Sequence, residues 1–204
     1  MAVIRMPTLY DIKPAFQALL RPLTRRLASA GVTANQVTVA ACALSMAAGA
    51  AIAWWPASRA VFWLLPLALF LRMALNAIDG MLAREHGQAS KLGMFLNELC
   101  DVISDLALIL PFAVVAPFPA WGVVAFALGA ALAEFAGVLG IAAGGGRRYD
   151  GPFGKSDRAL ALGAVAVVVA LGISFLPVAP YVFPAFALLS FATAANRVRA
   201  ALKA

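Results

Sequence analysis

Charge is scarce in this sequence, and so are cysteine and histidine. Of its 204 residues only 12% are charged and 64% are hydrophobic, whereas a soluble domain carries about 25% charged residues. Two cysteines, Cys42 and Cys100, lie inside apolar runs without the spacing of a disulfide framework or a zinc site. These shortages exclude most soluble enzyme folds, and they predict an integral membrane protein.

Negative charge is scarcer still, because nine acidic residues face 16 basic ones and the formal net charge is +7. The basic residues occur in small groups between apolar runs and do not cover one solvated face, so we expect no nucleic-acid partner. In membrane proteins the basic loops stay in the cytoplasm. The basic groups fall on one side when the chain crosses the membrane six times, which predicts that both termini are cytoplasmic.

Long apolar runs are the main positive feature, and each is near or above the roughly 20 residues that span a bilayer. The predicted fold class is all-α integral membrane, with six transmembrane helices preceded by an N-terminal interfacial amphipathic helix. The expected division is an interfacial segment over residues 1–32 and a six-span membrane domain over residues 33–204. The predicted spans cover residues 35–55, 60–84, 90–115, 120–143, 158–176 and 180–198.

The first 32 residues alternate apolar and basic side chains at helical spacing, which is typical of a helix lying on a membrane surface. Basic residues interrupt every apolar stretch here, so the segment does not read as a cleavable signal peptide. Pro22 is expected to bend this helix. Thr33 and Gln36 have the spacing of a capping box that opens the first span.

Five of the nine acidic residues fall within positions 79 to 105, where the predicted second and third spans meet. A charge inside a membrane is costly, so such residues usually face a bundle interior and mark a functional site. At helical spacing, two polar faces result. They are Arg72, Asn76, Asp79, Gly80, Ala83 and Arg84 on the second span, and Gly93, Asn97, Glu98, Asp101, Ser104 and Asp105 on the third.

Carboxylate and amide oxygens are the ligands of hard divalent cations, and arginine binds phosphate oxygens. Small residues such as Gly80 and Ala83 would let a nucleotide or pyrophosphate approach the helix closely. The two faces therefore favour a metal and phosphate site. The alternative is a buried polar network that holds helices together.

The segment from Asn76 to Asp101 resembles the signature of the CDP-alcohol phosphatidyltransferases, D-x2-D-G-x2-A-R-x8-G-x3-D-x3-D. Its spacing is unbroken, but Asn76 and Asn97 stand where the family has its first and third aspartates. The resemblance extends over the whole chain, and it implies six spans, an N-terminal interfacial helix, a cytoplasm-facing site, a homodimer and a place in the bacterial inner membrane.

In that family an acceptor alcohol attacks the phosphorus of a CDP-linked donor and CMP leaves. The resemblance implies Asp101 as the catalytic base, and one or two Mg²⁺ or Mn²⁺ ions as cofactor. It also implies two sets of ligands. The metal ligands would be Asp79, Asp101, Asn76 and Asn97, with Glu98 and Asp105 as auxiliaries. The CDP-binding residues would be Asp79, Gly80, Ala83, Arg84 and Gly93.

The two asparagines supply oxygen but no charge, which leaves three outcomes open: one metal, two weakly bound metals, or rescue by Glu98 or Asp105. Asp105 has an alternative role, because it lies one turn from Asp101 and could form a buried ion pair with Arg72. Glu134, in the middle of the fourth span, is expected to be protonated or paired with polar groups of the third span, in a structural role.

The segment 144–158 adds a second group of cations next to the expected site. Part of this charge is explained by the cytoplasmic location of the loop. The other interpretation is an anion site opening the fifth span, which favours a phosphorylated acceptor such as glycerol 3-phosphate. The predicted acceptor and phosphate ligands are Arg147, Arg148, Lys155 and Arg158.

The sequence therefore predicts a transferase that moves a phosphatidyl group from CDP-diacylglycerol to a small polar alcohol. One alternative is a CDP-choline or CDP-ethanolamine phosphotransferase acting on diacylglycerol. Another is a non-catalytic nucleotide or lipid binder that no longer binds metal ions because of the two asparagines. A transporter is disfavoured, because no internal repeat is evident.

Overall fold

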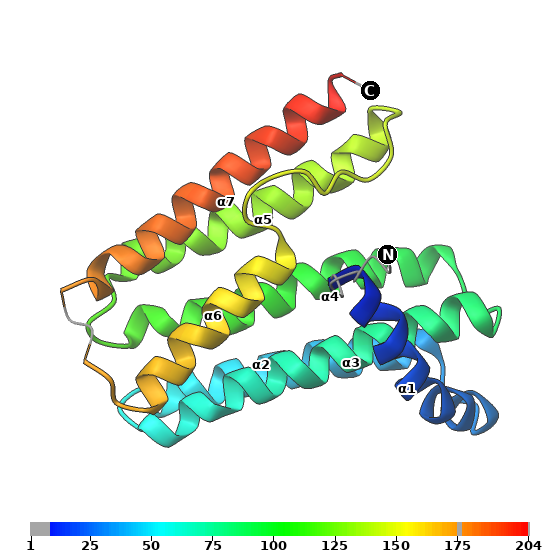
Figure 1. Cartoon of the computed structure of the whole chain (residues 1–204), viewed down its shortest axis with the longest axis horizontal. Coiled ribbons are helices and arrows are strands. Elements are labelled where there is room, and N and C mark those ends of the chain that lie inside the picture. The colour runs from blue at the N-terminus through cyan, green and yellow to red at the C-terminus, as the bar shows by residue number, and fades with distance from the viewer. Residues whose placement is uncertain (1–8, 175–176, 204) are drawn as a thin grey trace, which may run out of the picture. The chain divides into compact units, whose positions relative to one another are not determined.

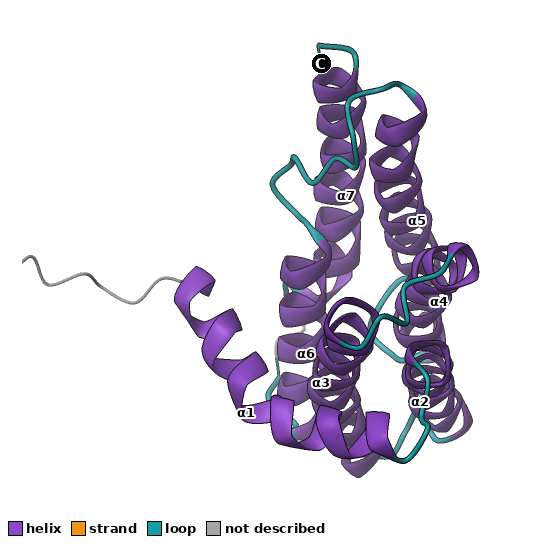
Figure 2. Cartoon of the chain, turned by 90° about the vertical axis from the view of Figure 1, so that its right-hand side faces the viewer, coloured by secondary structure: helices purple, strands orange, loops and turns teal. Residues whose placement is uncertain are grey.

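The computed structural model describes residues 9–174 and 177–203, and within them the chain forms helices joined by loops, with no strand (Figures 1 and 2). This confirms the all-α class. The elements are α1 Leu9–Ser29, α2 Ala34–Trp54, η1 Arg59–Trp63, α3 Leu64–Glu85, α4 Lys91–Ile109, η2 Leu110–Val114, α5 Ala120–Ala142, α6 Lys155–Ala170 and α7 Ala179–Ala201.

The helices follow the predicted runs, and the differences have local causes. α4 ends at Ile109 and continues as the 3-10 helix η2, where Pro111 has no backbone N–H to continue an α-helix. α6 begins at Lys155, earlier than expected, because the Asp157 carboxylate accepts the Gly154 N–H at 2.9 Å and caps the first turn. It ends at Ala170, before the left-handed Gly172 at φ +68°.

Within residues 9–174 and 177–203, three segments are long and apolar enough to cross a membrane: Ala34–Trp54, Arg59–Glu85 and Ala120–Ala142. α4 carries the charges of the signature, and α6 has only 16 residues. A membrane protein with apolar spanning helices is therefore established at this level, while the six-span count stays a prediction.

The chain divides into two compact units, residues 1–41 with 71–100 and residues 42–70 with 101–204. In the first unit, α1 packs its Leu20 and Leu27 against a small core that includes Val37, Met81 and Leu82. α1 is bent (Figure 2), as expected for a helix with Pro22 inside it.

A forked ion pair joins α1 to the end of α3 in this unit. Arg21 donates two hydrogen bonds of 3.0 Å to the Glu85 carboxylate. The predicted capping box is also confirmed, because the Thr33 N–H donates to Gln36 Oε1 at 2.9 Å and the Gln36 N–H donates to Thr33 Oγ1 at 3.2 Å. These contacts fix the connection from α1 into α2.

The second unit has a core of buried aromatic rings drawn from several elements. Phe112 of η2 stacks at centroid distances of 5.8 Å on Phe62 and 5.3 Å on Phe183, and all three are almost completely buried. α5 and α7 lie side by side along their lengths (Figure 1). Because lipid tails are as apolar as these rings, close van der Waals packing rather than removal from water is what stabilises such a core within a membrane.

The loop between α5 and α6 lies on small residues of α5 and α7. The Arg148 N–H donates to the Gly137 carbonyl at 3.0 Å, and the Phe153 N–H donates to Thr193 Oγ1 at 3.0 Å. Gly151 has φ +131°, and a Cβ there would lie 2.8 Å from the Thr193 Cα. The loop is thus held in one conformation directly before α6, the helix that carries Lys155 and Arg158.

Large apolar side chains cover the outside of the helices. Phe95 and Leu99, which helical spacing places opposite the polar residues of α4, are 61% and 58% exposed. Four tryptophans and one tyrosine near helix ends are also exposed, as expected of side chains at a membrane interface. They are Trp54, Trp55, Trp63, Trp121 and Tyr181.

A close approach of α2 and α4 within the second unit gives a test of the packing. A Cβ at Gly49 of α2 would lie 2.0 Å from the Ala107 carbonyl oxygen of α4, so the two backbones must separate in Gly49→Ala. Overpacking of this kind costs about 1–3 kcal/mol, and we expect a lower thermal unfolding midpoint in detergent.

Gly163→Ala is the matched control, because its Cβ would meet only the movable Leu69 Cδ1 at 3.3 Å. An unfolding midpoint that is equal in Gly49→Ala and Gly163→Ala would contradict the described contact between α2 and α4.

Candidate active site

A cavity of about 300 Å³ lies in the first unit, between the start of α2, the end of α3 and the start of α4. All five residues that the sequence predicts for CDP binding line it: Asp79, Gly80, Ala83, Arg84 and Gly93. The other lining residues are Ala34, Asn35, Thr38, Gln88, Ala89, Ser90, Met94, Asn97 and Glu98. The signature segment thus folds back on itself around one cavity.

Asp79 is the buried charge of this cavity, with only 6% of its surface exposed. The Thr38 hydroxyl donates to its Oδ2 at 2.8 Å. Thr38 is itself buried and lies one turn into α2. A hydroxyl donor of this kind orients a carboxylate ligand, in the way that outer-shell groups orient metal ligands.

Two glycines make room at the cavity wall. A Cβ at Gly80 would lie 3.0 Å from the Arg84 guanidinium, and a Cβ at Gly93 would lie 2.9 Å from Asn35 Oδ1. Because both neighbours are polar side chains lining the same cavity, the glycines allow them to take these positions. The sequence reasoning expected clearance at Gly80 and Gly93, and the structure shows which side chains use it.

Polar side chains outside the signature complete the wall. Gln88 accepts the Ala34 N–H at 2.6 Å and donates to the Val32 carbonyl at 3.3 Å, which ties the turn after α3 to the start of α2. Ser90 Oγ accepts the Gly93 N–H at 2.9 Å and caps α4. The sequence reasoning missed these two residues as well as Asn35 and Thr38. The contacts of Gln88 and Thr38 depend on tertiary structure, whereas the Ser90 cap is local.

Oxygen donors suited to a hard cation are present on this wall. Asp79, Asn97 and Glu98 all line the cavity, whereas Asn76 is not among its lining residues. No group of three or more His, Cys, Asp or Glu side chains within residues 9–174 and 177–203 is placed to hold a metal ion. The donor set therefore mixes carboxylate with amide oxygen, and its negative charge is low.

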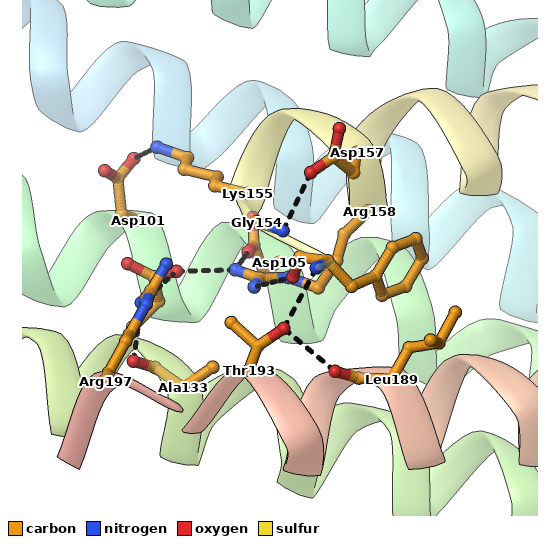
Figure 3. A network of polar contacts seen from close by, with 12 residues as sticks. Asp101, Asp105, Ala133, Gly154, Lys155, Asp157, Arg158, Leu189, Thr193 and Arg197 are labelled. Atoms are coloured by element: carbon orange, nitrogen blue, oxygen red, sulfur yellow. Dashed lines mark hydrogen bonds and ion pairs between the residues drawn. The ribbon is translucent and has the colours of Figure 1, made fainter. Parts of the chain in front are cut away.

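The second unit holds a polar network that starts at Asp101 on α4 (Figure 3). Lys155, the first residue of α6, forms an ion pair with Asp101. One turn further along each helix, Arg158 donates to Asp105 Oδ2 at 3.1 Å. Two successive turns of α4 and α6 are thus joined by ion pairs.

Glu134 of α5 is the centre of this network and is only 4% exposed. Its carboxylate accepts from Arg147 at 2.9 Å, from Arg158 at 2.7 Å and from Arg197 at 3.2 Å. The three arginines come from the loop before α6, from α6 and from α7. The expectation of a structural role fits this position, although its direct partners are these arginines and not polar groups of the third span.

Burial also affects the charges around Glu134. Desolvation lowers the pKa of the Arg147 guanidinium, because burial disfavours its charged form. Arg147 also lies over the Tyr149 ring, 5.3 Å from the centroid. Arg158 and Arg197 are each 2% exposed, and the Nε group of each is buried without a hydrogen-bond partner.

Each of the four basic residues predicted as acceptor or phosphate ligands has a carboxylate partner in the structure. Lys155 pairs with Asp101, and Arg148 pairs with Asp150 at 3.0 Å. Arg147 and Arg158 share Glu134. Sequence reasoning missed Arg197 entirely, since it lies in the last helix among other basic residues and only the tertiary fold brings it to Glu134.

Comparison with known proteins identifies the family of the chain. Residues 31–196 match the family described as CDP-alcohol phosphatidyltransferase. The chain is 46% identical over 195 residues to the inner membrane protein YnbA of Escherichia coli strain K12, which covers 96% of each chain. The chain therefore belongs to the CDP-alcohol phosphatidyltransferase family, and the prediction of a phosphatidyltransferase enzyme of a bacterial membrane is confirmed at this level.

Solved structures share the fold. The phosphatidylinositol phosphate synthase PgsA1 of Mycobacterium tuberculosis, in complex with manganese and citrate, superposes with a TM-score of 0.74 at 19% identity and covers 89% of this chain and 88% of its own. The same synthase with CDP-DAG bound has a TM-score of 0.63 at 20% identity and covers 89% of each chain. At these identities the likeness concerns the fold.

The Thr38 to Asp79 contact can be tested directly. Thr38→Val keeps the shape of the side chain but removes the donor to a buried carboxylate, and loss of such a partner costs about 1–3 kcal/mol. We expect a lower unfolding midpoint in detergent.

Thr38→Ser keeps the hydroxyl and should retain most of the midpoint. If Thr38→Ser loses as much as Thr38→Val, the hydrogen bond is not what stabilises this wall of the cavity.

Proposed function

We propose that the protein transfers a phosphatidyl group from CDP-diacylglycerol to a small polar alcohol at the cytoplasmic face of the membrane. The acceptor oxygen forms a bond to the phosphorus that carries the diacylglycerol. The bond from that phosphorus to the bridging oxygen of the pyrophosphate breaks, and CMP leaves with the electron pair. The proton of the acceptor hydroxyl passes to the Asp101 carboxylate as general base.

The observation that carries this proposal is the cavity around Asp79. Its lining contains the signature residues Gly80, Ala83, Arg84 and Gly93 together with side-chain amide and hydroxyl groups. A charged guanidinium beside small residues suits a pyrophosphate, because it allows close approach and supplies charge-assisted hydrogen bonds. Side-chain amides on the wall can donate to and accept from a nucleobase.

The donor set of the site fits a divalent cation of the Mg²⁺ or Mn²⁺ type, since hard oxygen ligands are what such ions require. We assign Asp79, Asp101, Asn76 and Asn97 as its ligands, with Glu98 and Asp105 as auxiliaries. When bound, the cation would neutralise pyrophosphate oxygens and stabilise the leaving CMP. With asparagine at two of four positions, one ion balances the charge of Asp79 and Asp101 better than two.

The ion pair with Lys155 supports the role of Asp101, because it holds the carboxylate in place against the first residue of α6. The loop before α6 is itself held by Gly137 and Thr193. A general base must be held in a fixed position for proton transfer to a bound hydroxyl to be efficient. We therefore propose that Lys155 positions the Asp101 carboxylate.

The topology completes the proposal. We infer six spans, with residues 1–32 as an interfacial segment, residues 33–204 as the membrane domain, and both termini in the cytoplasm. The alternating apolar and basic residues of α1 and the exposed apolar side chains of α4 support this arrangement. A homodimer is the assembly that the family resemblance implies.

Release of CMP from CDP-diacylglycerol by the purified protein in detergent, with Mg²⁺ or Mn²⁺ and a panel of alcohols, tests the proposal. Asp101→Asn keeps the size of the side chain but removes its basicity, so we expect CMP release to fall at least a hundredfold, the lower range for a general base. The unfolding midpoint and the detergent elution volume should stay close to those of the unchanged protein.

Asp157→Asn is the matched control, because Asp157 is exposed and an asparagine oxygen can still accept the Gly154 N–H. Full activity in Asp101→Asn would remove Asp101 as the base. A complete absence of CMP release with every alcohol and either metal, in protein that is folded, would contradict the proposed reaction.

The CDP-binding wall gives a separate prediction. In Gly80→Ala the new methyl group would displace the Arg84 guanidinium from its present position 3.0 Å away. We expect the affinity for CDP, measured by calorimetry, to fall about tenfold, or roughly 1.4 kcal/mol.

Gly163→Ala, the same substitution in the second unit, should bind CDP like the unchanged protein. Equal CDP affinity in Gly80→Ala and Gly163→Ala would exclude this wall as the nucleotide site.

A further inference from the structure

We infer that the acceptor is a non-phosphorylated alcohol, an inference that rests on the proposed function and names the substrate class of its acceptor side. The four basic residues of the segment 144–158 favour a phosphorylated acceptor when only the sequence is considered. In the structure each of these four residues forms an ion pair with a carboxylate of the same chain. The acceptor side therefore offers no ready-made site for a phosphate dianion.

The deepest cations already donate to groups of the same chain, while the buried Nε groups of Arg158 and Arg197 have no hydrogen-bond partner among the described residues. Arg158 donates to Asp105, to Glu134 and, at 3.3 Å, to the Phe153 carbonyl. Arg197 donates to Glu134 and to the Ala133 carbonyl. A phosphate that took these donors would have to displace the Glu134 carboxylate from them.

A Glu134 carboxylate displaced from its arginines would not reach solvent. Its side chain is 5% exposed, and the side chains of Arg158 and Arg197 are 3% and 2% exposed. A carboxylate separated from its cations at this depth would remain buried and unpaired, which is among the most costly arrangements in a protein. Glu134 thus occupies the position that an acceptor phosphate would need.

The accessible end of the network suits a neutral hydroxyl compound. The Lys155 and Asp101 side chains are 31% and 14% exposed, much more than those around Glu134. This pair presents one ammonium and one carboxylate, so its charges balance. A hydroxyl group can donate to the carboxylate and accept from the ammonium without any added charge.

The first experiment compares matched acceptors in the CMP-release assay with the unchanged protein. The pairs are glycerol with glycerol 3-phosphate, and inositol with inositol 1-phosphate. We expect kcat/KM to be at least tenfold higher for the non-phosphorylated member of whichever pair is used. An equal or higher kcat/KM for the phosphorylated member would overturn the inference.

The second experiment does not depend on turnover, so it separates this inference from the proposed function. Binding of inorganic phosphate and of glycerol 3-phosphate to purified protein is measured by calorimetry. We expect no binding up to millimolar concentration in the unchanged protein. In Glu134→Gln, which keeps the shape but removes the charge, we expect phosphate affinity to rise at least tenfold.

Asp157→Asn removes the same charge from an exposed position and should leave phosphate binding undetected. Tight phosphate binding by the unchanged protein, or no gain in folded Glu134→Gln, would refute the assigned role of Glu134. If Glu134→Gln does not fold, the inference is still tested by phosphate binding to the unchanged protein and by the comparison of acceptors. If CMP is released with no acceptor, the proposed reaction is contradicted. The phosphate-binding results still test the present inference.

Discussion

The second unit depends on one buried carboxylate. Glu134 accepts hydrogen bonds from Arg147, Arg158 and Arg197, which belong to the loop before α6, to α6 and to α7. A buried ion-pair network stabilises little by itself, because desolvation opposes the Coulombic gain, but removal of one member leaves uncompensated charge. The network therefore fixes where α6 begins relative to α5 and α7. The start of α6 in turn places Lys155 against Asp101, the carboxylate that we propose as the general base.

The first unit shows how a signature motif becomes a cavity. Glycine and alanine positions keep the wall open, while Thr38 and Gln88 connect the start of α2 to the residues of α3 and the turn after it. Asp79 and Glu98 are the carboxylates of this wall, and Asn97 adds an amide oxygen without charge. Low negative charge favours fewer cations and leaves more of the binding to amide and hydroxyl groups.

Much of this could be predicted from the sequence. Helical periodicity and long apolar runs predicted the helix positions, and the spacing of Thr33 and Gln36 predicted a capping box that the structure contains. The signature spacing predicted which residues gather around Asp79. What could not be predicted was pairing over long distances: the arginines of Glu134, the Thr38 hydroxyl on Asp79 and the Gln88 clamp. These contacts join residues 13 or more positions apart, and local patterns carry no information about them. The helix ends at Ile109 and Ala170 are set by Pro111 and by the left-handed Gly172, which lie inside or next to apolar runs that predict longer helices.

The central claim is that the Asp79 cavity holds the nucleotide of a CDP-linked lipid. The most direct test is a cryo-electron microscopy structure of the protein in a lipid nanodisc with CDP-diacylglycerol and Mn²⁺. The account predicts density for the cytidine and pyrophosphate between Asp79, Gly80 and Gly93, with the acyl chains leaving toward the lipid. Nucleotide density at another place on the protein, with the Asp79 cavity filled only by solvent, would contradict it.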